Sequence, residues 1–104
     1  MLLSTTPSIE GKTIKEYRGV VFGEVVNGIH FFNDLTASIS NVIGGRVSEY
    51  EEELVNNRAE AIKEMMNRSS KIGANAIVGV KVDYETISNS ILMVIASGTA
   101  VVIE

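Results

Sequence analysis

The sequence contains no cysteine and no tryptophan, and only one histidine and one proline among its 104 residues. Without cysteine, the chain forms no disulfide, no thiolate zinc site and no iron–sulfur cluster, and it offers no thiolate nucleophile. A secreted fold held together by disulfides is therefore excluded. Residues 1–7 have neither the basic region nor the apolar core of a signal peptide. We expect a cytoplasmic protein.

A long apolar run and an excess of positive charge are also missing. The longest uninterrupted apolar run covers residues 91–96, whereas a membrane-spanning helix needs about 18 such residues. The sequence has 9 Lys and Arg residues and 13 Asp and Glu residues, which gives a net charge of −4. Phosphate backbones bind to basic surfaces. We therefore expect neither a membrane nor a nucleic acid as partner.

Apolar side chains are abundant: 45% of the residues are hydrophobic and 21% are charged, so the chain is not of the disordered class. Its length suits one domain, which we place at residues 1–104.

The first half of the chain predicts two strands and a weak helix. Residues 2–6 predict a short strand at a sheet edge, and residues 13–27 predict a longer strand that ends at the turn dipeptide Asn27-Gly28. Residues 31–42 place apolar side chains at helical spacing but include many poor helix formers. They predict a short helix or an irregular connector that ends at Gly44-Gly45.

The clearest element is a long helix. Ser48 and Glu51 have the spacing of a capping box, and the acidic residues that follow favour the positive end of a helix dipole. Gly73 is placed to be the left-handed residue that ends the helix. The sequence predicts a helix over residues 49–72.

Two further strands follow. Residues 76–85 alternate, which predicts one buried face with Ala76, Val78, Val80, Val82 and Tyr84. Residues 91–103 are apolar on both faces, and Ser97-Gly98-Thr99 predicts a bulge or bend within them. The element order indicates an α+β fold with two layers: a mainly antiparallel sheet, with one long helix and one short or irregular helix on one face.

These elements are long for a lone chain. A compact chain of this length has a radius of gyration near ~13 Å and a diameter of roughly 35 Å. The long helix spans about 36 Å and the last strand about 43 Å if straight. In a monomer, one apolar face of that strand has nothing to pack against. We therefore predict an obligate homo-oligomer.

Arg58 is predicted to fall within the apolar stripe of the long helix, formed by Tyr50, Leu54, Ala61, Ile62, Met65 and Ser69. One interpretation is structural: the guanidinium pairs with a carboxylate such as Glu51, Glu24 or Asp83 and joins helix to sheet or subunit to subunit. The other is an arginine that binds an anion in a pocket.

Other candidate sites are sparse. Gly44-Gly45-Arg46 precedes a helix, where phosphates can bind, but it lacks the Lys and Ser/Thr of a P-loop, so we interpret it as a turn. The single histidine, His30, has Asp34 four residues later, and these two are the candidate metal ligands. Met65, Met66 and Met93 are interpreted as core. No nucleophile elbow or triad accompanies the histidine, so we expect no catalytic residues and no enzyme.

Several stretches together carry a family resemblance: Gly44-Gly45-Arg46 followed by residues 48–51, then residues 58–61, residues 73–80 and residues 98–101. In this order and spacing they resemble the YbjQ-like family of bacterial proteins, which is labelled as heavy-metal-binding. The resemblance implies a dodecin-subunit-like fold and a homopentameric ring. Tyr50, Glu51 and Arg58 match recurring family positions, and we interpret them as determinants of the fold or the interface.

Two functions follow as hypotheses. The first is a non-enzymatic homo-oligomer, a pentamer on the resemblance, that binds a small ligand or a metal ion between its subunits. The second is a scaffold ring that presents acidic helix faces to a protein partner and binds nothing small.

Overall fold

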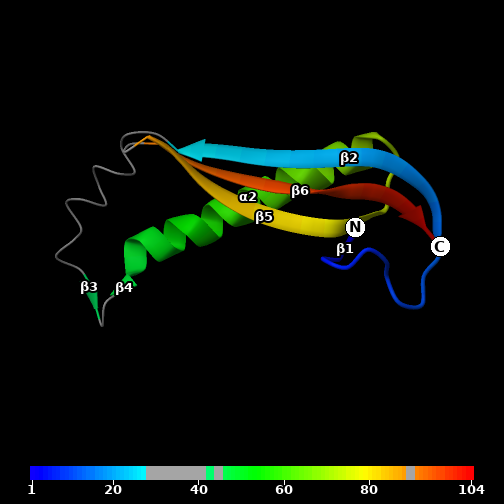
Figure 1. Cartoon of the computed structure of the whole chain (residues 1–104), viewed down its shortest axis with the longest axis horizontal. Coiled ribbons are helices and arrows are strands. Elements are labelled where there is room, and N and C mark those ends of the chain that lie inside the picture. Colours follow the sequence, from blue (N-terminus) through cyan, green and yellow to red (C-terminus); the bar gives the residue numbers. More distant parts are fainter. Residues whose placement is uncertain (28–41, 44–45, 89–90) are drawn as a thin grey trace.

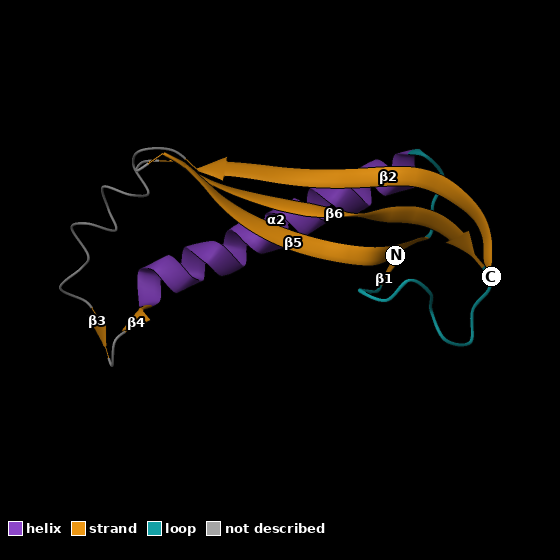
Figure 2. Ribbon diagram, in the orientation of Figure 1, coloured by secondary structure: helices purple, strands orange, loops and turns teal. Residues whose placement is uncertain are grey.

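The computed structural model describes residues 1–27, 42–43, 46–88 and 91–104. One four-stranded sheet carries a long helix against one face (Figures 1 and 2). The elements, in chain order, are β1 (Leu2–Leu3), β2 (Ile14–Asn27), β3 (Val42–Ile43), β4 (Arg46–Val47), α2 (Ser48–Lys71), β5 (Ala76–Ser88) and β6 (Ile91–Ile103).

The sheet has the strand order β1-β5-β6-β2. β1 is parallel to β5, and the other two pairings are antiparallel. The predicted α+β class, the mainly antiparallel sheet and the short N-terminal edge strand are confirmed. β3 and β4 pair separately with each other.

The predicted short helix falls almost entirely outside the described residues, as do Gly28 of the predicted turn and the Gly44-Gly45 pair. Val42, the last residue of that predicted helix, lies in β3.

α2 begins and ends close to its predicted limits. It starts at Ser48 and runs to Lys71, with Arg68 and Lys71 in its last turn, where cations favour the negative end of the helix dipole. Gly73 has a φ of 83°, the left-handed conformation predicted for the residue that ends the helix. Its amide donates to the Ser70 carbonyl, so the last turn is closed by the backbone itself.

Asn75 joins the end of α2 to the sheet. Its side-chain Nδ2 donates to the Ile103 carbonyl at 2.9 Å, and its Oδ1 accepts from the Ile103 amide at 2.7 Å. Its own backbone amide donates to the Val101 carbonyl. The carboxamide thus extends the hydrogen bonding of β6, which explains an asparagine between two alanines at this point.

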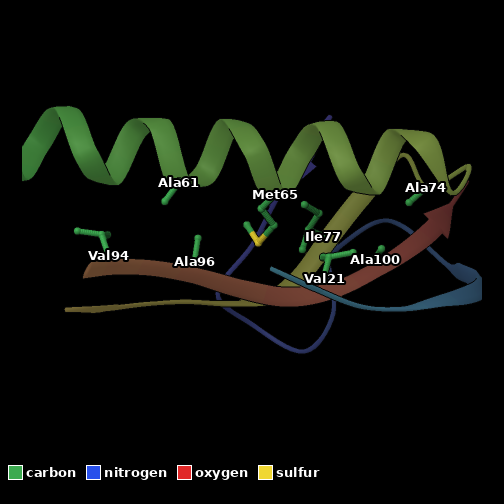
Figure 3. Packing of buried hydrophobic residues seen from close by; sticks show 8 residues of the cluster. All are labelled: Val21, Ala61, Met65, Ala74, Ile77, Val94, Ala96 and Ala100. Carbon is green, nitrogen blue, oxygen red and sulfur yellow. The ribbon is translucent and has the colours of Figure 1, made fainter. Parts of the chain in front are cut away.

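The core lies between α2 and the sheet, and Figure 3 shows it edge-on. The buried ridge of α2 has four-residue spacing: Asn57, Ala61, Met65 and Ser69. Its apolar members pack with cluster residues from the sheet and the α2–β5 connection: Val21, Ala74, Ile77, Val94, Ala96 and Ala100.

Gly23 permits the closest approach of helix and sheet. A Cβ at this position would lie 1.9 Å from the Ala61 carbonyl oxygen and 2.7 Å from the Met65 nitrogen. The backbone of α2 therefore rests directly on β2, and only glycine fits.

The single buried face predicted for residues 76–85, which lie in β5, is wrong. Ala76 and Val78 pack on the side of the sheet away from α2, whereas Ile77, Val80 and Val82 pack with the α2 core. The cause is a bulge: Val78 pairs with Thr99 and Lys81 with Ser97, so Gly79 and Val80 together oppose Gly98. Gly79 has a φ of 61°, and the extra residue shifts the alternation by one position.

β6 itself runs without interruption from Ile91 to Ile103. The bulge or bend predicted within this strand was therefore assigned to the wrong strand. The irregularity lies in its neighbour β5, directly opposite Gly98. A Cβ at Gly98 would lie 2.6 Å from the Ile77 Cγ2, so this glycine makes room for a core side chain rather than for a bend.

The chain is elongated. Its radius of gyration is 16.7 Å and its extents are 52 × 25 × 16 Å, whereas a compact chain of this length has a radius of about 13 Å. Among the described elements, no helix is long and apolar enough to cross a membrane.

We predict that Gly23→Ala destabilises the protein by about 3 kcal/mol, because the new methyl group must push the α2 backbone off β2. Urea denaturation followed by circular dichroism measures the loss. Gly98→Ala is the matched control: its nearest obstacle is a side-chain methyl group, so we expect a smaller loss. Equal stability of Gly23→Ala and the wild type would contradict the packing described.

Candidate functional site

The most unusual surface is the sheet face that points away from α2. Antiparallel partners share a face. Val20, Phe22 and Val26 pair with Thr99, Ser97 and Met93 and lie on this face, while Val21 and Gly23 between them face α2. The three side chains are 68%, 46% and 56% exposed. We call Val20, Phe22 and Val26 the open row.

The neighbouring part of β6 continues the open row. Met93 and Ile95 lie on the same face and are only partly buried. Val20, Phe22, Val26, Met93 and Ile95 thus make this face largely apolar across two strands, interrupted by Glu24, which lies between Phe22 and Val26 and pairs with Ile95. A largely apolar face of this kind on a single chain is typical of a surface that another molecule covers.

The chain covers the other end of this face with its own residues. Ile9, in the segment between β1 and β2, and Ile14 pack over a second cluster made of Ala76, Val78, Val101 and Ile103. The described part of the chain thus buries one end of this face and leaves the other end exposed.

Arg68 anchors α2 at the free edge of the sheet. β2 is an edge strand, and the Arg68 Nη1 donates to the Phe22 carbonyl at 2.8 Å and to the Glu24 Oε2 at 2.9 Å. Its Nη2 donates to Glu64, one turn earlier on α2. The guanidinium thus satisfies a carbonyl of the edge strand and neutralises two carboxylates.

The hydrogen bond to Glu24 raises the pKa of the Arg68 guanidinium; desolvation opposes this, and the charges of Glu24 and Glu64 add to it. A raised pKa in the folded state favours the protonated form. As far as the titration of Arg68 itself is concerned, the stabilisation is therefore lost only in strongly alkaline solution.

Arg58 is exposed on the flank of α2, so its predicted place in the middle of the buried stripe is wrong. Asn57 occupies that place, because α2 buries the ridge that contains Asn57, Ala61 and Met65. Of the three carboxylates considered as partners for Arg58, Glu24 pairs with Arg68 and Asp83 pairs with Lys81 at 3.4 Å.

Two other predicted residues, Tyr50 and Glu51, lie in the first turn of α2, and Glu51 is partly buried. His30 and Asp34 lie outside the described residues.

The donor set of the described residues does not fit a heavy metal. In this part of the chain, no three His, Asp or Glu side chains come together. Thioether sulfurs are the remaining soft ligands. Met65 is fully buried on the α2 side of the sheet, while Met93 lies on the opposite face, so these two sulfurs do not converge.

Three residues that the sequence reasoning did not select are structurally distinctive: Arg68, Asn57 and Asn27. The basic last turn of α2 was a signal for Arg68, but its partner Glu24 is 44 residues away. The Nδ2 atoms of Asn57 and Asn27 are buried and have no hydrogen-bond partner among the described residues. No sequence pattern marks an unpaired amide.

A family model described as "Putative heavy-metal-binding", of the YbjQ family, matches residues 1–104. A "UPF0145 protein" of Clostridium botulinum strain Eklund 17B is 58% identical over 106 residues, which cover 100% of both chains. One from Listeria ivanovii is 56% identical and covers 100% of this chain and 96% of its own.

A solved structure is also similar. It is a protein of unknown function of the DUF74 family from Pediococcus pentosaceus, with a TM-score of 0.68 and 18% identity over 100% of this chain and 98% of that one. At this identity the likeness establishes the α+β fold. The molecule is thus an α+β protein in which, over the described residues, one long helix covers one face of the sheet and part of the other face is open. The chain belongs to the YbjQ family, as the sequence resemblance predicted.

We predict that Arg68→Met lowers the melting temperature by a few degrees at low salt, because it leaves the Phe22 carbonyl and two carboxylates without their common partner. The difference should shrink in 1 M NaCl, since exposed ion pairs are screened. Differential scanning calorimetry measures both effects. Lys63→Met, on the exposed side of the same helix, is the charge-matched control. A variant as stable as the wild type at low salt would refute the anchoring role of Arg68.

Proposed function

We propose that the protein is a non-enzymatic, cytoplasmic homo-oligomer, a pentamer on the family resemblance, that binds a small ligand or a metal ion between its subunits. The names that its relatives carry include no reaction.

The open row carries the proposal. Val20, Phe22 and Val26 are apolar and exposed on an edge strand, and the same face is buried where the chain reaches over it. Each buried apolar side chain contributes roughly 1.5–3 kcal/mol. Another copy of the same chain is always present wherever the protein is. Self-association is therefore the most direct way to gain the free energy of burying the open row.

The elongated shape supports the same conclusion. The long helix and strands make the chain longer than a compact domain of the same size. An elongated chain exposes more surface to water than a compact one. Packing several copies side by side removes that surface from water.

A small organic ligand is favoured over a metal ion by the donor chemistry. The chain has no thiolate, and the described carboxylates form no metal-binding group. A site without soft or clustered charged donors suits an organic molecule better than a soft cation.

A scaffold is the second candidate. Glu52 and Glu53 are exposed near the start of α2, so a ring would display an acidic surface of several copies to a basic protein partner.

We predict that light scattering coupled to size-exclusion chromatography gives a mass that is a multiple of 11.2 kDa at micromolar concentration, about 56 kDa for five copies. Val20→Lys should lower that mass, because it places a charge in the open row at a site exposed enough not to disturb folding. Val55→Lys, at a half-exposed position on α2, is the control and should leave the mass unchanged. A wild-type monomer would overturn the assembly.

Native mass spectrometry and elemental analysis of the purified oligomer separate the two candidates. We expect a retained organic mass. A retained metal would favour the metal form of the proposal, and an oligomer with no adduct and no melting shift across a panel of metals and small acids would favour the scaffold.

A further inference from the structure

We draw no further inference here: the strongest candidate, the outer edge of β5 from Lys81 to Thr86, which the N-terminal segment leaves without a neighbouring strand among the described residues, carries none because nothing in the structure shows what covers it.

Discussion

The direct contact between the α2 backbone and Gly23 of β2 determines the arrangement of the rest of the molecule. A helix about 10 Å wide that rests on an edge strand reaches its neighbour β6 and covers one face of the sheet only. The same contact brings Arg68 to the free edge of β2 and directs Asn57 toward the strand's end. The Gly23 contact and the Arg68 hydrogen bonds thus hold α2 against the same strand.

The second consequence concerns β6, which is apolar on both faces and lies inside the sheet. On one side α2 buries it almost completely. On the other, Ile9 and Ile14 cover only one end, and the part that contains Phe22 and Met93 remains partly in water. Among the described residues, α2 and the short N-terminal segment leave part of this face uncovered, and this is the ground for proposing an oligomer.

Periodicity and capping signals predicted the element limits well: Gly73 does end α2, and the last strand runs over the predicted residues. The errors came from features that act between elements. A bulge at Gly79 reversed the faces of β5, and no local pattern distinguishes a bulge glycine from a strand glycine. α2 buries an oblique ridge, so Asn57 is buried and Arg58 is exposed. The pairing of Arg68 with Glu24 and the unpaired amides depend on three-dimensional proximity, which one sequence does not contain.

The central claim is that the functional unit is an assembly built on the open sheet face. Small-angle X-ray scattering at micromolar concentration tests it most directly, because it reports mass and shape in one measurement without immobilising the protein. The account predicts a radius of gyration well above the 16.7 Å of one chain and a forward scattering that corresponds to several copies of 11.2 kDa. A radius near that of the single chain, with the mass of a monomer, would contradict it.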